Sequence, residues 1–126
     1  MKKIDSKFLD SSAWLSYFLG DNQRMKDILD SNIFLLSSAL SIFEVERKLL
    51  KEKIPRTKIE NIINFIKKRS LVVEVEEVIA EAAAARSYEK KLATIDALIY
   101  ESALAHNAVL LTADYDFQGL SRVEII

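Results

Sequence analysis

Short apolar runs of strand length alternate along this chain with longer segments in which apolar residues recur at helical spacing. The runs lie at residues 7–10, 33–37, 71–75, 109–112 and 123–126. The clearest helical segment begins at Pro55, a residue that often starts a helix, and places four isoleucines on one face: Ile59, Ile62, Ile63 and Ile66. The pattern therefore predicts five short strands separated by helices, with this isoleucine face in the core.

Two more helices are predicted in the second half of the chain. One begins at Glu76 and Glu77 and ends near Lys90 and Lys91, an order of charges that complements the helix dipole. The other runs from about Thr94 to Asn107. Strands separated by helices of this length do not pair as hairpins. We therefore expect an α/β fold, a parallel sheet covered by helices, with the most apolar strands in its centre.

The composition is that of one ordinary globular domain, which we expect to span residues 1–126. The absence of cysteine excludes disulfides, thiolate zinc sites and iron–sulfur clusters. The longest uncharged run, residues 31–43, is shorter than the roughly 18 residues that a membrane-spanning helix needs. The first ten residues are charged where a signal peptide is apolar. We therefore expect a cytoplasmic protein with no membrane contact.

Charge is unevenly distributed, although the net charge is only −1. Residues 47–69 carry nine cations and two anions, a balance of +7, so the rest of the chain has a balance of −8. One part of the molecule can then attract phosphate groups while another part repels them or binds a cation. Solvent-exposed helix faces are the ordinary explanation for such a segment.

Four acidic residues occupy positions where a parallel-sheet protein commonly places its functional groups, beyond the carboxyl ends of the strands. Asp10 and Asp114 follow the first and fourth apolar runs, Glu44 lies in the helix after the second run, and Asp96 lies in the first turn of a mostly apolar helix. Each has an ordinary structural alternative: a helix cap, a favourable charge at a helix start, or an ion pair of Glu44 with Lys48.

Taken together, the four positions predict carboxylates gathered at one edge of the sheet. Like charges at close range raise each other's pKa and destabilise the fold unless a cation neutralises them. Because the donors are all oxygens, the expected ion is Mg²⁺ or Mn²⁺. Ser12 and Thr112 are close enough in sequence to Asp10 and Asp114 to support these carboxylates by hydrogen bonds, and Asp116 is a further supporting acid.

Other residues with side chains capable of chemistry have simpler interpretations. His106, the only histidine, falls at the end of a predicted helix, where we expect a structural role. Trp14, Tyr17 and Phe18 recur at helical spacing, which is more typical of core or of a protein contact than of base stacking. If they form a contact, the sequence leaves open whether a second subunit or another protein is bound there.

Four segments, FLDSSAW, the Glu44–Val45 pair in SIFEVERKLL, TIDALIYESAL and VLLTADYDF, resemble the PIN domain over almost the whole chain. The chain looks most like the VapC-type ribonuclease toxins of prokaryotic toxin–antitoxin pairs and their close archaeal relatives. The resemblance implies a three-layer sandwich around a central parallel sheet of about five strands, and an acidic pocket that binds Mg²⁺ or Mn²⁺. It implies that Asp10 and Asp96 bind metal and that Glu44 and Asp114 complete a catalytic quartet.

The activity implied by this resemblance is metal-dependent endonucleolytic hydrolysis of RNA. An acidic pocket repels RNA, so we expect Arg47, Lys48 and Lys51, which share a helix face with Glu44, to bind the phosphate backbone. The resemblance also implies a homodimer and a small VapB-like antitoxin as partners. The alternative is a catalytically inactive PIN-like module that binds RNA or assembles with other proteins. A receiver-type signalling domain fits less well, because Asp10 lacks an adjacent acid and no lysine follows the last strand.

Overall fold

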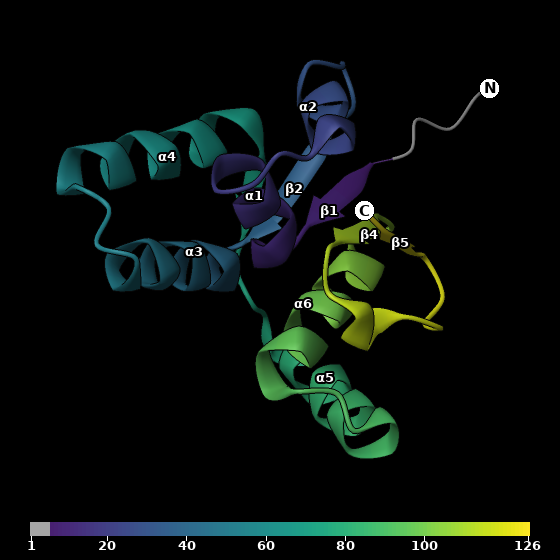
Figure 1. Ribbon diagram of the computed structural model, residues 1–126. Coiled ribbons are helices and arrows are strands. Elements are labelled where there is room, and N and C mark those ends of the chain that lie inside the picture. Colours follow the sequence, from purple (N-terminus) through teal and green to yellow (C-terminus); the bar gives the residue numbers. More distant parts are fainter. Residues whose placement is uncertain (1–5) are drawn as a thin grey trace.

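A single parallel sheet of five strands organises the computed structural model, which describes residues 6–126 (Figure 1). The expectation of a cytoplasmic protein rested on the charged first ten residues, and residues 1–5 of these lie outside the described part. The strand order is β3-β2-β1-β4-β5, and every neighbouring pair is parallel. The strands are β1 Lys7–Leu9, β2 Leu35–Ser38, β3 Leu71–Val73, β4 Val109–Thr112 and β5 Val123–Ile125. The expected parallel α/β sheet is confirmed.

Six helices and one short 3₁₀ helix connect the strands (Figure 1). They are α1 Ser11–Phe18, α2 Gln23–Leu29, α3 Ala39–Lys51, α4 Arg56–Arg69, α5 Glu77–Lys90, α6 Thr94–Ala105 and η1 Tyr115–Phe117. Polar side chains cap several of them; at the start of α3, for example, the side chain of Ser38 accepts a hydrogen bond from the backbone. Pro55 precedes α4 and makes no such bond. His106 directly follows the last residue of α6, so its expected position at a helix end is confirmed.

The helices cover both faces of the sheet and make it the middle layer of a three-layer sandwich. Alternate strand residues point to opposite faces, so Leu9 packs in one core and Phe8 in the other. The first core holds the buried faces of α1 to α4, including the predicted isoleucine face of α4. The second core holds α5, α6 and η1. Both cores meet the central strand β1, which therefore fixes the position of the residue that follows it.

The expectation that the most apolar strands are central fails for β3, whereas a core position for Trp14, one of its two expected roles, is confirmed. β3 is wholly apolar but forms one edge of the sheet, where Leu71 is 53% exposed, because apolar character does not specify how many partners a strand has. Trp14 is fully buried in the first core, and its indole Nε1 donates a hydrogen bond of 2.9 Å to Ser37. It therefore cannot form an external contact with Tyr17 and Phe18, which remain partly exposed beside Phe65 of α4.

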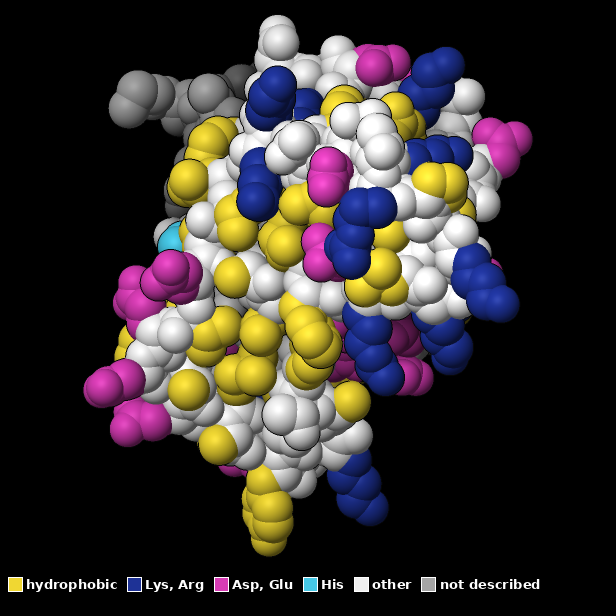
Figure 2. Space-filling model, turned by 90° about the vertical axis from the view of Figure 1, so that its left-hand side faces the viewer, with side chains coloured by type: hydrophobic (Ala, Val, Ile, Leu, Met, Phe, Trp, Pro, Cys, Tyr) yellow, Lys and Arg dark blue, Asp and Glu magenta, His cyan; other side chains and the backbone are white. Residues whose placement is uncertain are grey.

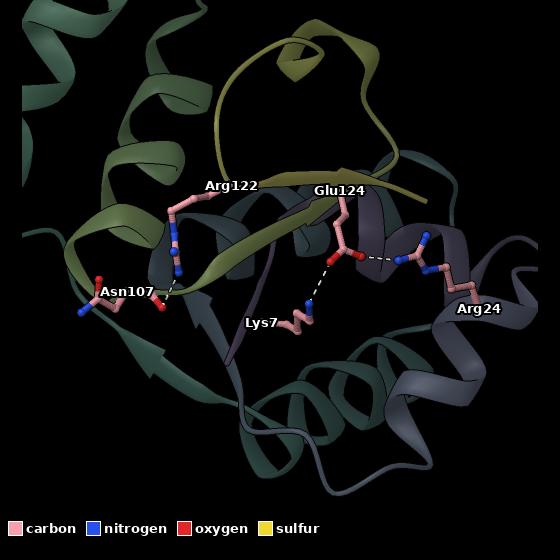
Figure 3. A network of polar contacts seen from close by, with 5 residues as sticks. All are labelled: Lys7, Arg24, Asn107, Arg122 and Glu124. Atoms are coloured by element: carbon pink, nitrogen blue, oxygen red, sulfur yellow. Dashed lines mark hydrogen bonds and ion pairs between the residues drawn. The ribbon is translucent and has the colours of Figure 1, made fainter. Parts of the chain in front are cut away.

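Charged side chains hold the outer elements in place. Glu124 of β5 lies between Lys7 of β1, at 2.8 Å, and Arg24 of α2, and Arg122 donates to the carbonyl of Asn107 (Figure 3). These contacts link β5 to segments that are distant in sequence. Within residues 6–126, no helix combines the length and apolar character required to cross a membrane.

Candidate functional site

Acidic side chains from four segments meet at the carboxyl edge of the sheet. Asp10 directly follows β1, and Asp114 is the second residue after β4. Glu44 lies in the second turn of α3, which starts at the end of β2, and Asp96 lies in the first turn of α6. Because β1 is between β2 and β4 in the sheet, the segments that leave these three strands converge.

Asp10 is the most buried of these acids, with 4% of its surface exposed. Its Oδ1 accepts hydrogen bonds from Ser12 Oγ at 2.7 Å and from the backbone N–H of Ala13 at 2.9 Å. Its Oδ2 accepts one from Thr112 Oγ1 at 2.5 Å. Burial raises the pKa of Asp10 to about 6, against the lowering effect of these three hydrogen bonds. One lone pair of Oδ2 is left for another partner.

Asp96, Asp114 and Asp116 form a group of neighbouring carboxylates, hereafter the acidic triad. One oxygen from each lies within 4.8 Å of the others. The turn of η1 makes this possible: Asp114 caps it by accepting a hydrogen bond of 2.9 Å from the backbone N–H of Asp116. The pKa of Asp96 is raised to about 6, first by burial and then by the negative charges of Asp114, Asp10, Glu44 and Asp116.

The acidic triad fits a small, hard divalent ion. Adjacent oxygens on one octahedral Mg²⁺ lie about 3 Å apart. The triad oxygens, which lie within 4.8 Å of one another, could reach this spacing by side-chain movement. Three carboxylates bring more negative charge than the described residues neutralise here, since none of the ion pairs in that part of the chain includes them. Asp10 and Glu44 are outside the triad, although their charges act on Asp96.

Hydroxyl groups donate hydrogen bonds to the carboxylates of Asp10 and Glu44, and one of these donors was not expected from the sequence. Ser12 and Thr112 both donate to Asp10, and Thr112 also accepts from the backbone N–H of Asp114 at 2.9 Å. Ser11, which the sequence analysis did not single out, donates to Glu44 Oε1 at 2.9 Å. Its position directly after Asp10 was the available signal, because two adjacent serines at a helix start point in different directions.

A basic hollow adjoins the acids between α1 and α3. Its volume is about 250 Å³, and the residues around it are Ser11, Leu15, Glu44, Arg47, Lys48 and Lys51. Lys48 also pairs with Glu52 at 3.0 Å rather than with Glu44. Lys and Arg side chains are spread over the part of the surface that α3 and α4 form (Figure 2). The three predicted phosphate-binding residues therefore share one hollow with Glu44.

A comparison with protein families agrees with this arrangement of acids at the edge of a parallel sheet. The family model described as PIN domain matches residues 7–123. The chain belongs to the PIN domain family. No protein of curated function matches the sequence significantly.

Solved structures share the fold at low sequence identity. A toxin–antitoxin complex from Klebsiella pneumoniae is similar at a TM-score of 0.79 and 24% identity, over 94% of this chain and 96% of that one. VapBC2 from Rickettsia felis, bound to a promoter DNA fragment, is similar at a TM-score of 0.76 and 16% identity, over 95% of this chain and 96% of that one. Mycobacterium tuberculosis VapC20, described as a sarcin–ricin loop cleaving toxin, is similar at a TM-score of 0.75 and 17% identity, over 92% of this chain and 95% of that one.

Proposed function

We propose that this protein is a metal-dependent endoribonuclease that hydrolyses RNA phosphodiester bonds, and that it is the toxin of a VapBC-type toxin–antitoxin pair. The observation that carries the proposal is the acidic triad at the carboxyl edge of a PIN-domain sheet. It is supported by the similarity to VapC20, the structure described as a sarcin–ricin loop cleaving toxin. The presence of an acidic residue at all four predicted positions favours an active enzyme over an inactive module.

In this proposal Asp96, Asp114 and Asp116 hold Mg²⁺ or Mn²⁺, with Asp10 as a further ligand through the free lone pair of Oδ2. When bound, the ion activates water and stabilises charge on the phosphoryl oxygens. Glu44 or Asp114 orients the attacking water and accepts its proton. The hydroxyls of Ser12 and Thr112 keep Asp10 in one orientation throughout.

The basic hollow supplies the attraction for RNA that the acids lack. Arg47, Lys48 and Lys51 hold the phosphate backbone beside Glu44. Binding of a phosphate to Lys48 competes with its exposed ion pair to Glu52, which is weak because solvent screens it. Replacing Lys48 and Lys51 by glutamate should weaken RNA binding and flatten its salt dependence, whereas unchanged binding would remove this assignment.

Two protein partners belong to the same proposal. The similarity to toxin–antitoxin complexes supports a small VapB-like antitoxin that blocks the acidic site. A homodimer is supported by hydrophobic side chains on the lower part of the face in Figure 2, and by exposed Phe43 and Leu50 of α3 and Val78 of α5. Phe43→Asp should then convert the dimer into a monomer in light scattering, and a wild-type monomer would contradict this part.

The activity is tested by incubating RNA with the purified protein and Mn²⁺, Mg²⁺ or chelator. We expect internal cleavage with either metal and none with chelator. Asp96→Asn keeps the shape of the side chain and removes its charge, so cleavage should fall at least a hundredfold while the protein stays folded. Undiminished cleavage by this variant would exclude the assigned site.

A further inference from the structure

A second hollow borders the acidic triad and is distinct from the basic hollow between α1 and α3. Its volume is about 260 Å³. The residues around it come from the end of α5, the α5–α6 connection and the segment after β4: Lys90, Leu92, Asp116, Gln118, Gly119 and Leu120. Asp116 belongs both to this hollow and to the triad, so a molecule bound here lies next to the proposed metal site.

The two hollows lie on different sides of the acids. The basic hollow contains Glu44 from the helix that follows β2, whereas the second hollow contains Asp116 from the segment that follows β4. β1, which leads to Asp10, is between β2 and β4 in the sheet. A single-stranded RNA that crosses the acids from the basic hollow would therefore reach the second hollow.

The groups around the second hollow suit a nucleotide. Lys90 is exposed and takes part in none of the ion pairs found in residues 6–126, so its ammonium group is available to a phosphate. The exposed amide of Gln118 has both donors and acceptors for a base edge or a ribose hydroxyl. Leu92 is buried and its carbonyl accepts a hydrogen bond of 2.7 Å from Ser87, which holds this side of the hollow in place.

Gly119 keeps the rim of this hollow low. Its φ of +91° is in the left-handed region, which favours glycine, and a Cβ placed there would meet no atom within 4 Å. The space next to the backbone is therefore open, and a planar base can approach the peptide groups on either side of Gly119.

We propose that this second hollow binds the RNA nucleotide on the side of the scissile phosphate opposite the basic hollow. Lys90 binds the phosphate of that nucleotide, and Gln118 contacts its base or ribose. The inference rests on the proposed ribonuclease function and extends it, because it assigns to Gln118 a part in the choice of cleavage site.

The first test compares two adjacent lysines. Lys91 is exposed like Lys90 and follows it directly, but it does not line the hollow, so Lys91→Gln is a matched control for Lys90→Gln. Binding of a short fluorescent RNA is measured over a range of salt concentrations with Ca²⁺ in place of Mn²⁺. Lys90→Gln should weaken binding about fivefold, the effect of one exposed charged contact, and lower the slope of log K against log salt by about 0.7. Lys91→Gln should change neither.

The second test maps the cleaved ends of a mixed RNA pool by sequencing. Gln118→Leu should alter the base preference at one position next to the cut. Equal effects of Lys90→Gln and Lys91→Gln, or an unchanged cleavage map for Gln118→Leu, would overturn the assignment and leave the ribonuclease proposal standing. If the wild-type protein cleaves no RNA with Mn²⁺ or Mg²⁺, both proposals fail together.

Discussion

Thr112 donates a hydrogen bond of 2.5 Å to Asp10 across 102 positions of the sequence. The same hydroxyl oxygen accepts the backbone N–H of Asp114. One side chain at the end of β4 therefore orients the acid that follows β1 and the start of the turn that carries two acids of the triad. This arrangement is possible because β1 and β4 are neighbours in a parallel sheet and end at the same edge.

Replacing Thr112 by valine keeps the shape of this side chain and removes its hydrogen bonds. The Oδ2 atom of Asp10 and the N–H of Asp114 each lose a partner in a largely buried place, so we expect the free energy of unfolding to fall by about 1–2 kcal/mol. Cleavage of RNA should fall as well, because Asp10 and Asp114 lose their fixed orientation. Thr112→Ser keeps the hydroxyl and should retain most activity. A valine variant with wild-type stability and cleavage would contradict this role.

The raised pKa values of Asp10 and Asp96 predict how the metal-free protein responds to pH. Both are about 6 in the folded protein and near 3.8 when unfolded, so the folded state binds more protons between these values. These two groups therefore make the folded state less stable as pH rises from about 4 to about 6, and the loss is complete above about 7. For buried Asp10 the loss is on the order of 2–3 kcal/mol.

Asp96→Asn isolates this effect from the other titrating groups. In chelator the variant should be more stable than the wild type at pH 7, by about 1 kcal/mol after allowance for solvent around the side chain, and equally stable near pH 4. Urea unfolding at several pH values measures the difference. With Mn²⁺ the order should reverse, because the ion stabilises only a site that binds it well. A stability difference independent of pH would show that the charge of Asp96 is not the cause.

Much of the fold could be predicted because it depends on local pattern. The five apolar runs correspond to the five strands, and Pro55 and the Glu76–Glu77 pair lie at the starts of α4 and α5. Sequence pattern could not place β3 at an edge or decide between a core and a contact position for Trp14, because both depend on which elements cover them.

The sequence predicted at which edge of the sheet the candidate site lies, but not which carboxylates are close to one another there. Acids at strand ends indicate where side chains converge, but the distance between carboxylates depends on turns such as η1, which brings Asp116 into the triad. In the same way, only the direction of the first turn of α1 shows that Ser11 contacts Glu44 while Ser12 contacts Asp10.

Ser11→Ala tests whether Glu44 needs this contact. Ser11 is partly exposed, so the loss of its hydroxyl should change the free energy of unfolding by less than about 1 kcal/mol. If Glu44 acts in catalysis, its freer side chain should lower the cleavage rate several-fold without a change in RNA affinity. Ser11→Thr restores the hydroxyl and should restore the rate. Full activity of the alanine variant would mean that Glu44 does not depend on this hydrogen bond.

Arg69 gives a prediction about stability without a change in the site. At the end of α4 it donates four hydrogen bonds to backbone carbonyls at and just after the end of α2: Ile28, Leu29, Ser31 and Ile33. Two of these carbonyls, Ile28 and Leu29, belong to the last turn of α2, where a helix leaves its carbonyls without helical partners, although Ile28 also accepts from Ser31. Arg69→Met should therefore lower the free energy of unfolding by about 2–3 kcal/mol, measured by urea denaturation. Lys68→Met, which removes an exposed neighbouring charge, should change it by less than 0.5 kcal/mol. Below its melting transition the Arg69 variant should still cleave RNA, since none of its partners is an acid of the site.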